Sequence, residues 1–335
     1  MLMVGAGDIG RRVLAKLKRH DQVIAATSTP PKRPALKRLG AQPVLADLDK
    51  RGTLKRLPRD WQVLLHCAPP QSYLTRDVRT RNLLAALSLR NSSRGPAVAP
   101  RAYATARSYA AARSDATTRS YPNANARCVV YLSTSGVYGD CGGARITEAQ
   151  PLKPNNARAR RRADAERMLT RAAKRGAFRL VILRVPGIYA HDRLPLARLK
   201  AGTPALLPEQ DVYTNHIHAA DLAAITLAAI RRVRRRRRPQ VRVYHASDDS
   251  NASDERALRM GDYFDLVAAA FGLPRPPRLP RAQLDAALSP LLRSFMSESR
   301  RLDNTRMKRE LRIRLQFGTV AEGVAAAAKL LTSQA

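Results

Sequence analysis

The chain has 335 residues, 44% of them hydrophobic, and a formal net charge of +35 at pH 7. This length can bury a substantial core, and the sequence shows neither an apolar run long enough to span a bilayer nor a signal-peptide pattern, so we expect no membrane partner. The charge comes from 50 Arg against 11 Lys scattered over the whole chain, with only 5% aromatic residues. We therefore expect no specific nucleic-acid partner.

Cysteine usage indicates the compartment. Cys67, Cys128 and Cys141 have neither the paired spacing of a disulfide framework nor the spacing of metal ligands. An odd number of cysteines without a framework indicates reduced thiols. We therefore expect a cytoplasmic protein.

A glycine-rich turn follows the first apolar run. Residues 5–10 spell G-x-G-x-x-G directly after residues 1–4, and a helical pattern follows. Gly5 permits the tight turn, Gly7 lets the backbone approach a pyrophosphate, and Gly10 lets the helix pack close to the strand. This context predicts a dinucleotide site, the alternative being a glycine turn without a ligand. The shortness of the first strand suggests that the chain starts inside it.

Apolar strand-like runs and helical patterns alternate as far as residue 245, which is typical of a parallel sheet covered by helices. We expect strands at 23–27, 43–46, 63–67, 129–132, 180–183 and 241–245, and helices at 34–39, 78–89, 157–175 and 219–233. Right-handed crossovers then give a doubly wound sheet with strand order 3-2-1-4-5-6-7. An amphipathic helix, a proline-rich linker and further helical segments follow. They predict a small C-terminal lobe over 246–330, to which 187–211 contributes.

Two segments fall outside this pattern. Residues 91–127 carry a degenerate Ala-Arg-Ser-Tyr repeat with almost no large aliphatic residues. Such a segment cannot bury a core, so we interpret it as a low-complexity insertion in a domain that spans 1–245. The arginine run at 231–238 is interpreted as a solvated loop, with a nucleic-acid contact as the alternative.

Together these motifs resemble the extended or atypical short-chain dehydrogenase/reductases, the group often labelled NAD-dependent epimerase/dehydratase. The resemblance covers nearly the whole chain except the insertion. It rests on residues 5–10, 46–48, 66–70, 131–139, 184–189 and 215–222. It implies an α/β fold with a doubly wound parallel sheet (Rossmann) and a small C-terminal substrate lobe. It also implies a bound NAD(P), a small-molecule substrate and the option of a homodimer.

The resemblance assigns most of the cofactor contacts. Asp8 and Ile9 belong, with the three glycines, to the phosphate-binding turn. Asp47 would hydrogen-bond the adenine amine beside the backbone of Leu48. Ala68 and Pro69 would line the channel to the nicotinamide ribose, and Pro186, Gly187 and Ile188 would close over the nicotinamide.

The end of the second strand favours NADP over NAD. An acidic residue near that position would bind the ribose 2′-hydroxyl of NAD, and the sequence has none there. Ser28, Lys32 and Arg33 supply a hydroxyl and two cations instead, which fit a 2′-phosphate.

The candidate catalytic residues depart from the family pattern. Thr134 stands where the family places its catalytic Ser or Thr and would hydrogen-bond a substrate oxygen, unless it only caps backbone at the strand end.

The family's Tyr-x-x-x-Lys pair is replaced by Arg158 and Arg162, which are i, i+4 on one helix face. Arg162 can still place a positive charge near the cofactor ribose. Arg158 cannot replace a tyrosine, because a guanidinium with a pKa above ~12 does not exchange protons at pH 7. The alternative for both is pairing on the helix surface, for example Arg162 with Glu166.

Two histidines and an aspartate have structural interpretations. His216 and His218 lack a third ligand at a suitable spacing, so no metal site is expected. Asp221, directly before Leu222, is interpreted as a helix N-cap.

Three functions remain open, of which the third, a nucleic-acid-associated protein, rests on the net charge alone. The first is an NADP-linked oxidoreductase or epimerase with a non-standard proton donor, for which Tyr138, Tyr189 and His191 are candidates, and with an anionic substrate held by Arg158. The second is a non-catalytic dinucleotide-binding sensor or regulatory protein. Residues 135–136 are Ser-Gly where sugar-nucleotide dehydratases of the family carry Asp-Glu, which argues against dehydration.

Overall fold

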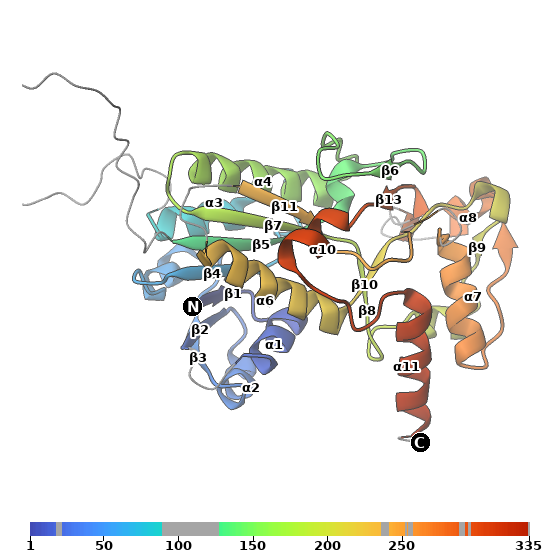
Figure 1. Cartoon of the computed structure of the whole chain (residues 1–335), viewed down its shortest axis with the longest axis horizontal. Helices are drawn as coiled ribbons and strands as arrows, with labels where there is room; N and C mark the ends of the chain where they lie inside the picture. Colours follow the sequence, from blue (N-terminus) through green and yellow to red (C-terminus); the bar gives the residue numbers. More distant parts are fainter. Residues whose placement is uncertain are drawn as a thin grey trace, which may run out of the picture.

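The computed structural model of the chain describes residues 1–17, 22–88, 127–235, 241–251, 253, 257–287, 292–293 and 296–333. At its centre lies a seven-stranded parallel sheet with the order β11-β7-β5-β4-β1-β2-β3 (Figure 1). The strands are β1 (Leu2–Val4), β2 (Val23–Thr27), β3 (Ala41–Leu45), β4 (Val63–His66), β5 (Cys128–Thr134), β7 (Arg179–Val185) and β11 (Val241–His245). The predicted order and the doubly wound class are confirmed.

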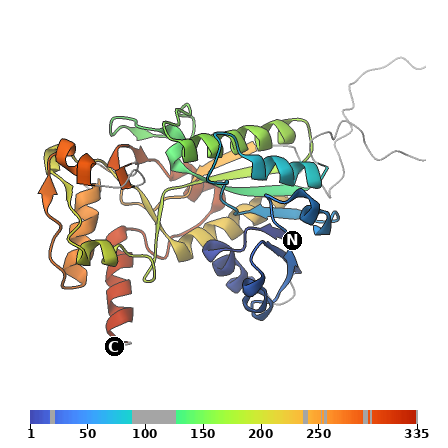
Figure 2. The same ribbon diagram turned by 180° about the vertical axis from the view of Figure 1, so that it is seen from behind.

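Helices cover both faces of the sheet (Figures 1 and 2). One face carries α1 (Asp8–Ala15), α2 (Arg33–Arg38) and α6 (Ala219–Arg235), and the other carries α3 (Val78–Ala86) and α4 (Ala157–Lys174). Three 3₁₀ turns complete this region: η1 (Pro30–Lys32), η2 (Arg51–Arg56) and η3 (Ser135–Tyr138). The expected helices therefore form within a few residues of their predicted bounds.

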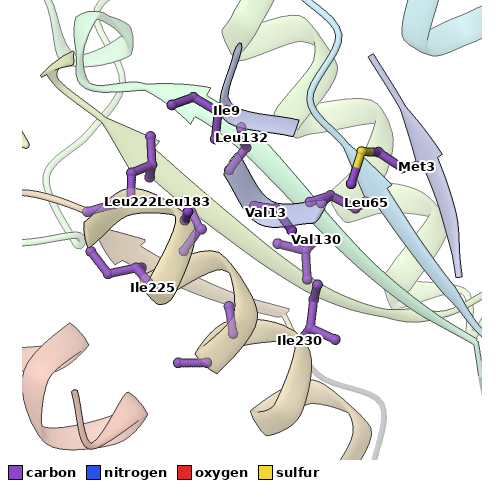
Figure 3. Packing of buried hydrophobic residues seen from close by; sticks show 14 of the residues in the cluster. Met3, Ile9, Val13, Leu65, Val130, Leu132, Leu183, Leu222, Ile225 and Ile230 are labelled. Atoms are coloured by element: carbon purple, nitrogen blue, oxygen red, sulfur yellow. The ribbon is translucent and has the colours of Figure 1, made fainter. Parts of the chain in front are cut away.

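The central strands β1, β4 and β5 are apolar runs because both of their faces are buried. Val130 and Leu132 of β5 point into the core beneath α1 and α6 (Figure 3). Val129 and Tyr131 of the same strand point into the core beneath α3 and α4. Successive side chains alternate between the two layers, which is why no polar position interrupts the run.

A further hydrophobic cluster lies at the C-terminal end of the sheet strands. It combines α5 (Leu196–Lys200), α7 (Met260–Ala270), α8 (Arg281–Ala287) and α11 (Val320–Thr332) with short two-stranded pairs. Strands β8 (Gly187–Tyr189), β9 (Ala205–Leu206) and β12 (Arg278–Leu279) contribute to it, and a 3₁₀ turn, η4, spans Pro208–Gln210. Strand β10 (His216–His218) pairs with β8, and β6 (Arg145–Ile146) pairs with β13 (Arg301–Leu302) in a separate small cluster with Val137 and Tyr138. Residues of the 187–211 segment, such as Leu199 and Leu206, pack in this cluster with α7.

The boundary of the expected lobe is not sharp. Helix α10 (Thr305–Leu311) lies late in the chain, yet its Met307 and Leu311 pack into the main sheet core. The division into 1–245 and 246–330 stays a prediction. The insertion at 91–127 lies outside the described residues except for Arg127, as does part of the arginine run, residues 236–238. Within the described residues, none of the helices combines the length and apolar character needed to cross a bilayer.

Candidate functional site

The glycine turn after β1 is tightly built at two of its three glycines. Gly5 has a φ of +88°, and a β-carbon there would lie 2.3 Å from the backbone nitrogen of Ala68. A β-carbon on Gly10 would lie 3.1 Å from the carbonyl oxygen of Gly5. Gly5 therefore excludes a side chain for reasons of backbone conformation and packing, whereas Gly10 leaves only tight space for one.

Gly7 differs from its two neighbours. A β-carbon on Gly7 would meet nothing within 4 Å, so space lies open beside the turn. Gly7 is also the N-cap of α1, and no side chain caps the first turn of that helix. An uncapped helix N-terminus beside open space, next to a strand end, is a suitable site for a pyrophosphate. The residues of the turn therefore fit a dinucleotide.

Asp8 connects this turn to the region beyond β8. Its carboxylate pairs with Arg12 at 2.8 Å and with Arg193 at 2.6 Å. Partial burial works to raise the pKa of Asp8, but hydrogen bonds from Arg193 and Arg12 lower it overall. The two cations thus offset the carboxylate at a helix N-terminus where an anion is expected to bind.

The residues predicted for the adenosine end lie along one sheet edge. Thr27 and Leu45 pair in register at the ends of β2 and β3, so Ser28 and Asp47 follow neighbouring strand ends. Ser28, Lys32 and Arg33 are exposed to solvent there. Asp47 is partly buried, and its side chain accepts the backbone N–H of Asp49 at 2.9 Å.

A pocket of about 460 Å³ opens beside the ends of β5 and β7. It brings together all three predicted catalytic residues and the predicted nicotinamide-closing segment. These are Thr134, Arg158, Arg162, Pro186, Gly187 and Ile188. The lining also includes Tyr213, Glu298, Arg300 and Arg193.

Thr134 both caps backbone and faces this pocket. Its Oγ1 accepts the backbone N–H of Gly136 at 3.2 Å, as the alternative interpretation expected. A hydroxyl that accepts one hydrogen bond can still donate its own proton. The observed capping is therefore compatible with a hydrogen bond from Thr134 to a substrate oxygen.

The two arginines of α4 have different surroundings. Arg162 donates from Nη1 to the carbonyl oxygen of Leu132 at 2.8 Å and to the hydroxyl of Tyr131 at 3.1 Å. These bonds fix the Arg162 guanidinium at the pocket wall. Arg158 is exposed at the pocket rim. Partial desolvation and the nearby charge of Arg162 lower the pKa of Arg158, which stays cationic at pH 7.

The suggested surface pair between Arg162 and Glu166 is wrong. Glu166 is buried, pairs with Arg184 at 2.8 Å and accepts the hydroxyl proton of Ser133 at 2.6 Å. A buried carboxylate needs such a full set of partners, and Arg184 supplies them from β7. Glu166 is therefore not a partner of Arg162, whose guanidinium lies at the pocket wall.

The tyrosines suggested as proton donors lie elsewhere. Tyr138 and Tyr189 are each 1% exposed, and neither lines the pocket. Tyr138 hydrogen-bonds His245 at 2.5 Å and Arg184 at 2.6 Å, and burial raises its pKa to about 12. The Tyr189 hydroxyl donates to a backbone carbonyl oxygen at 3.2 Å. His191 is also absent from the described pocket lining.

Two other titratable side chains that face the pocket were missed from sequence. Tyr213 lies between the guanidinium groups of Arg259 and Arg301, which are 5.3 and 5.0 Å from its ring centroid. Glu298 is only 7% exposed and accepts hydrogen bonds from Arg300 at 2.8 Å and Asn156 at 3.2 Å. No sequence motif marked either residue, because Tyr213 lies in the irregular segment between η4 and β10 and Glu298 lies in the irregular segment before β13.

The two histidines have aromatic neighbours. His216 lines the inner end of the pocket with its ring centroid 4.2 Å from that of Tyr263, and burial lowers its pKa to about 3. His218 packs against Phe317, and burial lowers its pKa to about 4. In the described part of the chain, no three His, Cys, Asp or Glu side chains gather as a metal site would require.

The N-cap assignment of Asp221 is wrong. Asp221 lies inside the first turn of α6, which begins at Ala219. Its carboxylate accepts the backbone N–H groups of Gln316 and Phe317 at 2.7 and 2.9 Å. The side chain therefore anchors a distant loop and does not cap its own helix.

Comparisons with known proteins identify the family and the fold. The model of the NAD dependent epimerase/dehydratase family matches residues 1–244. None of the curated proteins matches the sequence. A functionally unknown conserved protein from Silicibacter pomeroyi is 27% identical, with 98% of each chain covered and a TM-score of 0.70.

Two enzymes of lower identity share the fold. UDP-glucuronic acid 4-epimerase from Bacillus cereus, solved in complex with NAD, is 15% identical with a TM-score of 0.66, and 99% of this chain and 98% of that chain are covered. UDP-glucose 4-epimerase from Thermotoga maritima, solved with UDP-glucose, is 16% identical with a TM-score of 0.67 and the same coverage.

Proposed function

Because this chain belongs to the NAD dependent epimerase/dehydratase family, we propose that it is an NAD(P)-dependent epimerase or oxidoreductase that acts on a small anionic substrate. One observation carries the proposal. A single pocket combines Thr134, the cations Arg158 and Arg162, and the segment expected to cover a nicotinamide. A pocket with this many guanidinium groups favours a carboxylate or phosphate on its ligand.

The roles of the residues follow from their positions. When bound, the dinucleotide supplies or accepts the hydride. Thr134 orients a substrate oxygen, Arg158 binds the anionic group, and Arg162 holds positive charge at the pocket wall. Proton exchange falls to Tyr213 or Glu298, because no tyrosine occurs in α4 and the buried tyrosines lie outside the pocket.

The test is a panel of carbonyl and hydroxyl substrates with NADPH and NADH, together with mass spectrometry of any small molecule that co-purifies. Turnover of an anionic substrate supports the proposal.

The second candidate function is a non-catalytic dinucleotide-binding sensor, favoured by the arginine at the tyrosine position. Tight dinucleotide binding without turnover of any substrate in the panel would support that second function instead.

We also propose that NADP(H) binds more tightly than NAD(H). Replacing both Lys32 and Arg33 with alanine should weaken NADP(H) binding about tenfold and leave NAD(H) binding unchanged, since only NADP carries the 2′-phosphate. Calorimetric titration of both dinucleotides measures this. The double replacement of Lys37 and Arg38 with alanine is the matched control, because both are exposed cations at the other end of α2. Equal affinity of the wild-type protein for both dinucleotides, or tighter NAD(H) binding, would contradict the preference.

A further inference from the structure

A network of ion pairs ties the loop at residues 190–195, between β8 and α5, to the first helix. Arg12 of α1 donates from Nε to Asp8 at 2.8 Å and from Nη2 to the two carboxylate oxygens of Asp192 at 2.8 and 2.7 Å. Arg193 donates from Nη1 to the other oxygen of Asp8 at 2.6 Å. The loop is therefore held against the N-terminal end of α1.

The energetics of the fold give this network little reason to exist. Its side chains are between 23% and 49% exposed, and ion pairs at such exposure contribute little to the free energy of unfolding. The network also places the Asp8 carboxylate in the first turn of α1, where the pyrophosphate of a dinucleotide is expected. An acid repels that anion unless a cation lies beside both of them. This arrangement points to a role in ligand binding.

Arg193 lies where the two halves of a dinucleotide would meet. It lines the candidate active-site pocket together with Pro186 and Ile188 of the predicted nicotinamide-closing segment. Its partner Asp8 directly follows Gly7, beside which space is open. The pyrophosphate links the adenosine half to the nicotinamide half, so it must lie between the glycine turn and this pocket. Arg193 borders both.

The Arg193 guanidinium has donors left for an anion. A guanidinium carries five N–H groups, and the bond to Asp8 uses one of them. Within the described part of the chain, the Nε and Nη2 atoms of Arg193 have no hydrogen-bond partner. The planar fork of an arginine matches the oxygens of a phosphate group. Arg193 can therefore hold Asp8 and a phosphate at the same time, whereas Arg12 is engaged by both aspartates and anchors the loop.

We propose that Arg193 binds the pyrophosphate of the dinucleotide and that Asp8 holds its guanidinium in place for this contact. The inference rests on the proposed function and adds to it a cofactor-binding residue outside the glycine turn. The pyrophosphate would then be bound from two sides, by the N-terminus of α1 and by the loop after β8.

The experiment is calorimetric titration of NADPH, or of NADH if the wild-type protein binds that more tightly. Arg193→Gln should weaken binding at least about tenfold, because it removes charged hydrogen bonds to the ligand. ADP-ribose, with a 2′-phosphate where NADPH is used, keeps the pyrophosphate and lacks the nicotinamide, so its affinity should fall by the same factor. Arg193→Lys should lose only about threefold, since an ammonium keeps the charge without the fork. Thermal melting should change little for both variants.

Asp8→Asn separates a direct contact from an indirect one. If Arg193 acted only by offsetting the charge of Asp8, Arg193→Gln would cost nothing once Asp8 is an asparagine. A direct contact predicts a loss of at least about tenfold in that background too. Lys308→Gln is the matched control, because it removes a cation paired with Asp249 at 2.8 Å outside the pocket, and it should keep the wild-type affinity.

The outcomes distinguish this inference from the proposed function. A wild-type protein that binds no dinucleotide would remove both. Wild-type binding with an Arg193→Gln affinity within about threefold of it would overturn the inference alone. The inference would also be overturned by a loss confined to the complete dinucleotide, which would assign Arg193 to the nicotinamide, or by an equal loss in Lys308→Gln. Full rescue of Arg193→Gln by Asp8→Asn would do the same.

Discussion

Gly7→Val should leave the protein folded and weaken dinucleotide binding about 100-fold or more. The space beside Gly7 is empty in the protein, so the new side chain meets no protein atom close to its β-carbon. The same space is where the pyrophosphate of a dinucleotide would approach the backbone. Loss of charge-assisted hydrogen bonds to the backbone at about 1.5–3 kcal/mol each accounts for a loss of this size.

Gly5→Ala is the informative comparison, because it should have the opposite pattern. Its β-carbon would overlap the backbone of Ala68, and its φ is positive, so we expect a loss of about 3 kcal/mol or more in the free energy of unfolding. Thermal melting and calorimetric titration together separate the two variants. A Gly7→Val protein that binds NAD(H) and NADP(H) like the wild type would remove the dinucleotide from this turn.

The order of the sheet could be predicted because its signals are local. Each buried strand is a short apolar run bounded by turn residues, and each crossover helix has its own periodicity. The handedness of βαβ units then leaves few topologies, and the observed order is the expected one. The position of α10 was harder to predict, because Met307 and Leu311 pack against a core that was formed far earlier in the chain.

The parts of the site that lie at strand ends could be predicted from the sequence, and the other parts could not. Thr134 ends β5, Pro186 directly follows β7, and Arg158 lies in the first turn of α4. One pocket contains all three residues. Tyr213 and Glu298 reach that pocket from irregular segments before β10 and β13, which have no periodic signal. The ion-pair partner of Glu166 could not be predicted either, because Arg184 belongs to the next strand and not to the helix of Glu166. Local spacing suggests i, i+4 pairs, but buried Glu166 pairs with a strand of the sheet on which its helix packs.

Arg158→Ala should lower kcat/KM for an anionic substrate about 100-fold, while thermal stability should change little. Arg158 lies exposed at the pocket rim, so its removal should perturb the core little. A guanidinium that grips a carboxylate or phosphate bidentately contributes about 2–3 kcal/mol, and 1.4 kcal/mol corresponds to a factor of ten. Steady-state kinetics on the substrate found in the panel measures the effect, with Arg314→Ala, an exposed arginine outside the pocket, as the control.

The residue at position 158 also determines which substrates the pocket can turn over. The wild-type protein should turn over neutral ketones and alcohols poorly, because a guanidinium at position 158 neither donates nor accepts a proton at pH 7. Arg158→Tyr combined with Arg162→Lys rebuilds the family's usual pair on the same helix face and should raise activity on neutral substrates relative to the wild type. Robust reduction of neutral ketones by the wild-type protein would contradict this account. So would unchanged rates on the anionic substrate after Arg158→Ala, since the anion would then be bound by other groups of the pocket.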